Sequence, residues 1–149
     1  TLPPAQEDRL ALLEGRMDLV MIDAPCSGTG VWRRRPDSKW RLTPAHLGQQ
    51  IKVQGELLMK GAALVKPGGS LAYITCSVLP EENCDRIEDF LAGNPGFHAV
   101  DLTEGAANIL SHPLARAKTA DIDKTGLLLT PARYETDGFF IALLKKDEA

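Results

Sequence analysis

Two apolar, strand-like runs, each followed by a cysteine, constrain the fold of this chain more than any other feature of its sequence. Residues 19–22 lead through Asp23 to Cys26, and residues 71–74 lead to Cys76. A helix-like segment follows each run, and this βαβα order favours parallel strands joined by crossover helices. Ligands of such sheets bind beyond the carboxyl ends of the strands. We therefore expect both thiols to face one cleft, beside the aspartate.

Hydrophobic periodicity and turn residues predict the remaining elements of an α/β fold. Helices are expected over residues 1–15, 44–65 and 80–93, and strands over residues 18–23, 71–74, 97–102, 127–129 and 139–144. Loops are expected at residues 25–43 and 103–124, the second with a short helix near 106–110, and a polar tail at 145–149. No Gly-rich turn follows a strand early in the chain, and Gly28 and Gly30 lack the third glycine of a dinucleotide-binding fingerprint. The sequence therefore reads as the back half of a larger domain.

The composition restricts the class of protein. The chain has 149 residues, enough for one domain, and its 44% hydrophobic and 25% charged residues are ordinary for a soluble globular fold. Its net charge of -3 means that any nucleic-acid binding must rely on a local patch. No run is long enough to span a membrane and no signal-peptide pattern opens the chain, so no membrane association is expected. Three cysteines without a close pair indicate a reducing compartment, and we expect a cytoplasmic protein.

No metal site is expected from the sequence. The three histidines, His46, His98 and His112, lie far from one another and from any pair of cysteines, so no group has the spacing of zinc ligands. We interpret all three as surface or cap residues. Asp137 and Gly138 are interpreted as a turn before the last strand rather than as part of a site.

A thiolate beside a carboxyl group suits the methylation of a pyrimidine ring. Attack of the thiolate at C6 makes C5 nucleophilic, so that C5 can accept a methyl group, and the carboxyl group can hold the ring. A second group must then take the proton from C5. Cys26, Cys76 and Asp23 could supply these groups, but the two cysteines could equally be small buried hydrophobic residues at strand ends. Cys84, on the apolar side of its helix, is expected in the core.

The loop over residues 31–42 concentrates positive charge and indole rings. It contains Arg33, Arg34, Arg35, Lys39 and Arg41, with Trp32 and Trp40 among them. Cations make salt-dependent contacts with phosphates, and indoles stack on unpaired bases. We expect the RNA contacts to come from Arg33, Arg34, Arg35, Lys39 and Trp32. The alternative is a solvated basic loop whose tryptophans only pack.

Residues 23–30 (DAPCSGTG) resemble motif IV of the Sun-type RNA (cytosine-5) methyltransferases, the family that includes the ribosomal RNA methyltransferase B-like enzymes and the nucleolar proteins. Residues 75–77 (TCS), followed by residues 80–83 (PEEN), resemble motif VI of that family. Further matches occur at residues 32–37, 66–69 and 136–140, so that the similarity extends from residue 18 to residue 145.

The resemblance implies a fold and a set of roles. The family fold is a Rossmann-like class I methyltransferase sheet of strand order 3-2-1-4-5-7-6 with the seventh strand antiparallel, of which this chain would supply strands 4, 5, 6 and 7. Residues 1–149 would then be a partial catalytic domain without its N-terminal cofactor-binding half. Cys76 would attack C6 of a cytosine in RNA, ribosomal RNA above all. Cys26 would assist release, Asp23 would contact the ring, and Asp23 and Pro25 would also line the site of the cofactor, S-adenosylmethionine.

The missing half has further consequences. The strand at residues 18–23 would become an exposed edge, which we expect to be covered by self-association or by the helix at residues 1–15. We also expect this fragment alone to bind S-adenosylmethionine weakly or not at all, and to be inactive. Two other functions remain open at this stage. One is a non-catalytic RNA-binding or assembly module, and the other is a redox thiol enzyme, which the absence of a C-x-x-C motif disfavours.

Overall fold

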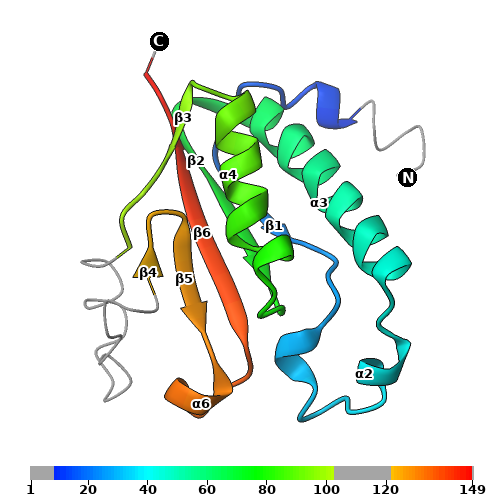
Figure 1. The fold of residues 1–149 in the computed structure, drawn as a ribbon. Coiled ribbons are helices and arrows are strands. Elements are labelled where there is room, and N and C mark those ends of the chain that lie inside the picture. The colour runs from blue at the N-terminus through cyan, green and yellow to red at the C-terminus, as the bar shows by residue number, and fades with distance from the viewer. Residues whose placement is uncertain (1–8, 103–121, 149) are drawn as a thin grey trace.

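The computed structural model describes residues 9–102 and 122–148. These residues form one mixed sheet with two long helices side by side on one of its faces (Figure 1). The strands are β1 (Met17–Asp23), β2 (Val65–Thr75), β3 (Phe97–Ala99), β4 (Ile122–Asp123), β5 (Gly126–Leu129) and β6 (Phe139–Lys146). The helices are α2 (Ser38–Arg41), α3 (Pro44–Leu64), α4 (Cys84–Gly93) and α6 (Pro131–Tyr134), with 3-10 turns η1 (Thr29–Val31) and η2 (Pro80–Glu82).

The sheet has the strand arrangement that the resemblance implies. Its order is β1-β2-β6-β5-β4, and β1 pairs in parallel with β2. β6 runs antiparallel to β2, and its other edge pairs with β3 at one end and with β5 at the other. An antiparallel last strand thus lies between β2 and β3, as expected for strands 5, 7 and 6 of the family fold.

Helix α3 depends on packing as well as on its own sequence. Thr43 caps its first turn by accepting a hydrogen bond from the backbone N–H of His46, and Pro44 occupies the first helical position. Glycines weaken the helix interior. One of them, Gly61, allows close packing, because a Cβ atom there would lie 2.8 Å from Cδ1 of Ile22 in β1. The helix is therefore held against the sheet at this point.

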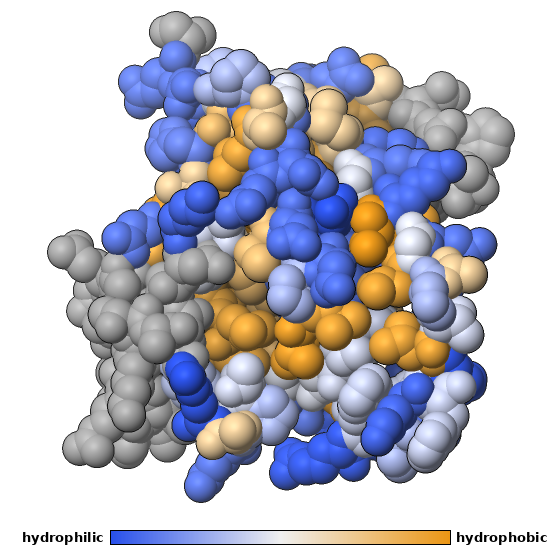
Figure 2. Space-filling view, viewed as in Figure 1, coloured by the Kyte–Doolittle hydropathy of each residue, from blue (hydrophilic) through white to orange (hydrophobic). Residues whose placement is uncertain are grey.

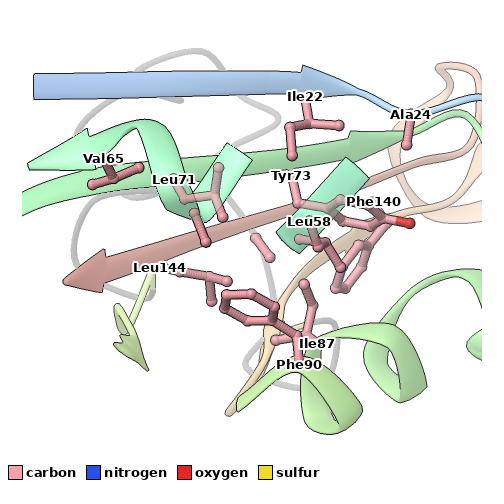
Figure 3. Packing of buried hydrophobic residues seen from close by; sticks show 12 residues of the cluster. Ile22, Ala24, Leu58, Val65, Leu71, Tyr73, Ile87, Phe90, Phe140 and Leu144 are labelled. Carbon is pink, nitrogen blue, oxygen red and sulfur yellow. The ribbon is translucent and has the colours of Figure 1, made fainter. Parts of the chain in front are cut away.

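The hydrophobic core lies between the sheet and the two long helices (Figure 3). It contains residues from three neighbouring strands and from both helices: Ile22, Leu71, Tyr73, Phe140, Leu144, Leu58, Ile87 and Phe90. Beside it, Phe90 and Phe97 meet edge to face with ring centroids 5.4 Å apart. Figure 2 shows that α4 presents a largely hydrophilic surface outward, with apolar side chains exposed below and beside it in this view. No helix among the described residues is long and apolar enough to cross a membrane.

Several boundaries differ from the predicted ones. β2 begins at Val65 rather than residue 71, because Val65 already pairs with Met17, before an irregularity over residues 66–69 shifts the register. β3 ends at Ala99 rather than residue 102. β6 extends into the predicted polar tail, where Lys146 pairs with Phe97 and donates from Nζ to the carbonyl of Val65. Each of these strand ends is set by backbone pairing with a neighbouring strand, which the pattern of apolar residues does not predict.

Some helical segments also differ from the predicted ones. The predicted helix over residues 80–93 is a 3-10 turn followed by α4, and the predicted loop over residues 25–43 contains η1 and α2. Residues 9–11 are helical, whereas the rest of the predicted first helix either forms turns or lies outside the described residues. The short helix expected near 106–110 also lies outside them.

β1 is an edge strand of the described sheet. Its residues alternate, with Ile22 buried in the core and Leu19 and Met21 exposed at 53% and 65%. The prediction that this strand forms an edge is confirmed within the described residues, whereas the covering of that edge, by self-association or by the helix at residues 1–15, stays a prediction.

Candidate functional site

Two cysteines meet just beyond the carboxyl ends of β1 and β2. In the parallel register Asp23 pairs with Ile74, and the chain then leads three residues on to Cys26 and two residues on to Cys76. The two Sγ atoms lie 3.4 Å apart. Both side chains are partly buried, and both thiols are reduced. The structure thus brings together the two thiols that the chain order placed at one end of the sheet.

The two thiols have different acidities. The hydrogen bond from Cys26 stabilises the thiolate of Cys76 and lowers the pKa of Cys76 to about 7, against the opposing effects of burial and of the charges of Asp23 and Glu82. The same hydrogen bond, together with burial, raises the pKa of Cys26. Of the two thiols, Cys76 is therefore the one that loses its proton more readily, with Cys26 as its hydrogen-bond donor.

Asp23 lies at the end of β1 with an exposed side chain. Its carboxylate makes no hydrogen bond or ion pair within the described part of the chain, although its charge reaches Cys76. Pro25 is also exposed, with its carbonyl accepting a hydrogen bond from Nε2 of Gln54 at 2.9 Å. The Asp23 carboxylate is therefore available to a ligand beside the thiols.

A buried carboxylate, Glu82, fixes the turn that carries Cys26. Its Oε1 atom accepts from the backbone N–H of Ser27 at 2.8 Å, and its Oε2 atom accepts from the Ser27 hydroxyl at 2.5 Å. Nε2 of Gln54 donates to Oε1 as well, at 3.1 Å. Both Glu82 and Gln54 are fully buried. The sequence analysis missed this role, because it considered Glu82 only as part of the motif at residues 80–83.

A second group of polar side chains joins the two cysteine-bearing segments behind the thiols. Oγ1 of Thr29 and Oγ of Ser77 lie 3.0 Å apart, and the backbone N–H of Val78 donates to Thr29. Thr75 donates to Oδ1 of Asn83, whose amide donates in turn to the carbonyl of Ser77. These contacts couple the segment after β1 to the segment after β2.

Two glycines let three segments meet at the site. The Gly30 N–H donates to the carbonyl of Cys76 at 2.9 Å, and the Gly138 N–H donates to the carbonyl of Gly30 at 2.8 Å. A Cβ atom on Gly30 would lie 2.8 Å from the Cys76 carbonyl oxygen and closer still to that of Gly138. Only glycine permits this approach of the segments that follow β1 and β2 to the start of β6.

The basic loop is tied to the same junction by Asp137. Arg34 lies 2.6 Å and Arg33 3.9 Å from its carboxylate oxygens. Asp137, which the sequence indicated as a turn residue only, is mostly buried, whereas the side chains of Arg33 and Arg34 are 70% and 60% exposed. Arg35 is exposed, and Lys39 lies over the rings of Trp32 and Trp40.

The remaining candidate residues lie away from the thiol pair or play local roles. Cys84 is only partly buried, so the expectation of a core residue was wrong: α4 turns it toward the carbonyl of Pro80. His98 pairs with Asp147 on the surface, and His46 contacts Gln50 within α3. His112 lies outside the described residues. In the part of the chain that is described, no three acidic, His or Cys residues form a group that could hold a metal ion.

Comparison with known proteins agrees with this geometry. A family model, 16S rRNA methyltransferase RsmB/F, matches residues 5–145. The chain is 39% identical over 133 residues to ribosomal RNA small subunit methyltransferase B of Salmonella paratyphi B, an alignment that covers 89% of this chain and 27% of the relative. The chain therefore spans about a quarter of the length of the curated relatives it matches.

Solved structures show the same fold. The crystal structure of PH0851 matches with a TM-score of 0.75 at 37% identity, covering 89% of this chain and 27% of the other. NSun6 from Pyrococcus horikoshii, solved with SFG, matches with a TM-score of 0.62 at 24% identity, covering 87% of this chain and 30% of the other. With the family match over nearly the whole chain, the parallel β1–β2 pair and the antiparallel β6, this chain belongs to the 16S rRNA methyltransferase RsmB/F family and has a Rossmann-like fold.

Proposed function

We propose that this chain is the C-terminal part of a catalytic domain that methylates C5 of a cytosine in ribosomal RNA through a covalent bond between Cys76 and C6. The observation that carries the proposal is the pair of thiols 3.4 Å apart, of which Cys76 has the lowered pKa, beside the exposed carboxylate of Asp23. The family and the relatives support RNA, and 16S ribosomal RNA in particular, as the substrate class.

S-adenosylmethionine is the methyl donor of this methyltransferase family. The described residues fit one side of its site. Asp23 offers an unpaired carboxylate, and Pro25 an exposed ring, at the carboxyl end of β1, where ligands of such sheets bind. The other edge of β1 carries no strand among the described residues.

Each step of the proposed reaction can be assigned to a residue of this chain that carries it out. The Cys76 thiolate forms a bond to C6, and the electrons of the C5–C6 double bond move to C5, which takes the methyl group. Asp23 holds the ring. Once the sulfur of Cys76 is bonded to carbon, its charge no longer raises the pKa of Cys26, so Cys26 can lose its proton to solvent. Cys26 then takes the proton from C5, the electrons of that C–H bond restore the C5–C6 double bond, and the bond between C6 and sulfur breaks with its electrons returning to Cys76.

The basic loop is proposed to hold the RNA beside this site. Arg33, Arg34 and Arg35 present mostly exposed guanidinium groups, and Lys39 and Trp32 lie in the same loop. Asp137 fixes the loop to the start of β6, and Gly30 in the segment that precedes it bonds to the Cys76 backbone. Phosphate contacts made here would therefore lie close to the segments that carry the thiols.

Substitution of the two cysteines tests the proposal in a protein that carries the complete methyltransferase domain. Cys76→Ala should abolish methyl transfer because no thiolate adds to C6. Cys26→Ala should trap a covalent RNA adduct, since addition proceeds and release fails. Denaturing gel electrophoresis of labelled RNA with each variant measures both effects.

Cys84→Ala is the matched control, because Cys84 lies on α4 outside the thiol pair, and it should neither trap RNA nor lose activity. If Cys26→Ala turns over normally while Cys76→Ala traps the adduct, the assignment of roles is reversed. A complete absence of adducts with every variant, combined with normal methylation, would exclude the covalent route.

A further inference from the structure

Cys26 lies between two peptide groups that side chains from outside its turn hold in place. On one side Nε2 of Gln54, from α3, donates to the carbonyl of Pro25 at 2.9 Å. On the other side Glu82, from η2, accepts the backbone N–H of Ser27 at 2.8 Å and the Ser27 hydroxyl at 2.5 Å. Gln54 also donates to Glu82 at 3.1 Å, which joins the two contacts. The turn is thus gripped on both sides of the thiol.

Burying the polar side chains of Gln54 and Glu82 costs free energy, which their hydrogen bonds to the turn must offset. Both side chains are fully buried, and burying a carboxylate is costly unless hydrogen bonds compensate for its lost hydration. Gln54 makes only half of its possible contacts, because its Oε1 atom is buried without a partner. Buried polar atoms are rarely left so. Only the two N–H donors of the Gln54 amide are used. One bonds to the turn directly, at the Pro25 carbonyl, and the other bonds to Glu82, which itself holds the turn.

We propose that Glu82 and Gln54 are positioning residues that hold the Pro25–Ser27 turn so that the thiol of Cys26 faces Cys76. The consequence rests on the proposed function: the reactive form of Cys76 would depend on two residues that touch neither the RNA nor the cofactor. Their joint action keeps the two Sγ atoms at their distance of 3.4 Å, close enough for a hydrogen bond from Cys26 to Cys76.

The charge of Glu82 raises the pKa of Cys76, whereas the position in which Glu82 holds Cys26 lowers it. These opposite effects make the proposal testable. The titratable groups that act on Cys76 are Cys26, Asp23 and Glu82, and of these only the hydrogen bond from Cys26 lowers its pKa. Loss of the Glu82 charge alone should therefore lower the pKa of Cys76 further. Loss of the grip on the turn should raise it, because the hydrogen bond from Cys26 weakens.

The experiment measures the rate at which iodoacetamide alkylates Cys76 between pH 5 and 10, with peptide mass spectrometry to separate Cys76 from the other two cysteines. It needs only this chain, without RNA or cofactor, so its outcome is independent of whether the methylation proposal holds. In the unaltered chain the rate should rise through a pKa of about 7. Glu82→Met and Gln54→Met keep the side-chain volume, remove the grip, and should slow alkylation at pH 7 about tenfold as the thiol returns toward its ordinary pKa.

Glu82→Gln is the variant that separates the two effects. Its Oε1 atom can still accept from Ser27 and Gln54, while its amide donates to the Ser27 hydroxyl, so the grip survives without the charge. Alkylation at pH 7 should then be unchanged or faster. Glu81→Gln, on the exposed neighbour in η2, is the matched control and should leave the profile unchanged.

Two results would overturn the proposal. One is a folded Gln54→Met variant with the same pH profile as the unaltered chain, and this variant decides the matter if Glu82→Met fails to fold. The other is a Glu82→Gln variant that slows alkylation as much as Glu82→Met does, since hydrogen bonds that hold the turn would then not be enough to keep Cys76 reactive. Circular dichroism establishes folding before either profile is compared.

Discussion

The connection between β1 and α3 has two halves that differ in almost every physical respect. The first half, residues 24–31, is largely buried and bonded to β2, η2 and α3, with Ala24, Ser27 and Val31 each less than a tenth exposed. The second half, residues 32–42, is open to solvent, and Trp40 is 81% exposed. The same connection thus contains a rigid half that sets the geometry of a thiol and an open half whose charges can meet a substrate.

This contrast explains how one loop can serve two needs. A nucleophile needs fixed neighbours, because small displacements weaken a hydrogen bond steeply. A surface that contacts RNA needs exposed cations that can follow phosphates. Close to the junction of the two halves, backbone hydrogen bonds of Gly30 tie the connection to Cys76 and Gly138. The predictions below test whether the halves are as independent as their burial indicates.

The largest effect is expected at the junction of the two halves. Gly30→Ala should destabilise the chain by about 3 kcal/mol, because its Cβ atom would meet the backbone of Gly138 and of Cys76 with no flexible side chain to yield. Denaturant unfolding measures this. Gly48→Ala in α3, where a Cβ atom meets nothing within 4 Å, should instead stabilise the chain by about 0.5 to 1 kcal/mol. Equal effects at the two positions would mean that the junction is not tightly packed.

The next effect concerns the open half alone. Replacing Arg33, Arg34 and Arg35 together with alanine should weaken binding of single-stranded RNA at least about tenfold and reduce the salt slope of the affinity by about 2, because fewer counterions are released. Fluorescence anisotropy at several salt concentrations measures both. Removal of Lys52 and Lys60, which are exposed on α3, is the control and should change the slope less. An unchanged slope in the arginine variant would assign the loop a structural role.

A smaller effect is expected where the open half is tied down. Asp137→Asn removes the ion pairs to Arg33 and Arg34, whose exposed guanidinium groups are well screened by water, and should cost less than about 1 kcal/mol at low salt. The cost should vanish near 1 M salt, where screening acts over about 3 Å. Thermal melts at the two salt concentrations compare them. A loss above about 2 kcal/mol that persists in high salt would show that the open half contributes to the core after all.

The smallest effect is expected at the most exposed aromatic residue. Trp40→Ala should change the unfolding free energy by no more than about 0.5 kcal/mol, since a surface side chain loses little on truncation. Trp32→Ala should cost more, because Trp32 is partly buried and its indole N–H is enclosed. The same denaturant titration ranks the two variants. A larger cost for Trp40→Ala than for Trp32→Ala would contradict the finding that the loop becomes more exposed from Trp32 to Trp40.

Much of the sheet could be predicted because its signals are local. The apolar runs before Cys26 and Cys76, and the helices that follow them, indicated the parallel pair β1–β2, since crossover connections leave the chain little choice. The likeness of the cysteine motifs to those of a known family indicated the antiparallel β6 and the methyltransferase fold. The ends of β2, β3 and β6 could not be predicted, because they depend on which partner strand lies beside each residue.

The candidate site divides in the same way. The amino-acid sequence by itself determined which residue types stand after each strand: two thiols, an aspartate, and a basic loop that follows the first thiol. Only the tertiary structure decided that Glu82 and Gln54 are buried and hydrogen-bonded to the turn of Cys26, and that Asp137 forms an ion pair with Arg34. The physical reason is that burial and hydrogen bonding of a polar side chain depend on residues distant in the chain, which no local pattern encodes.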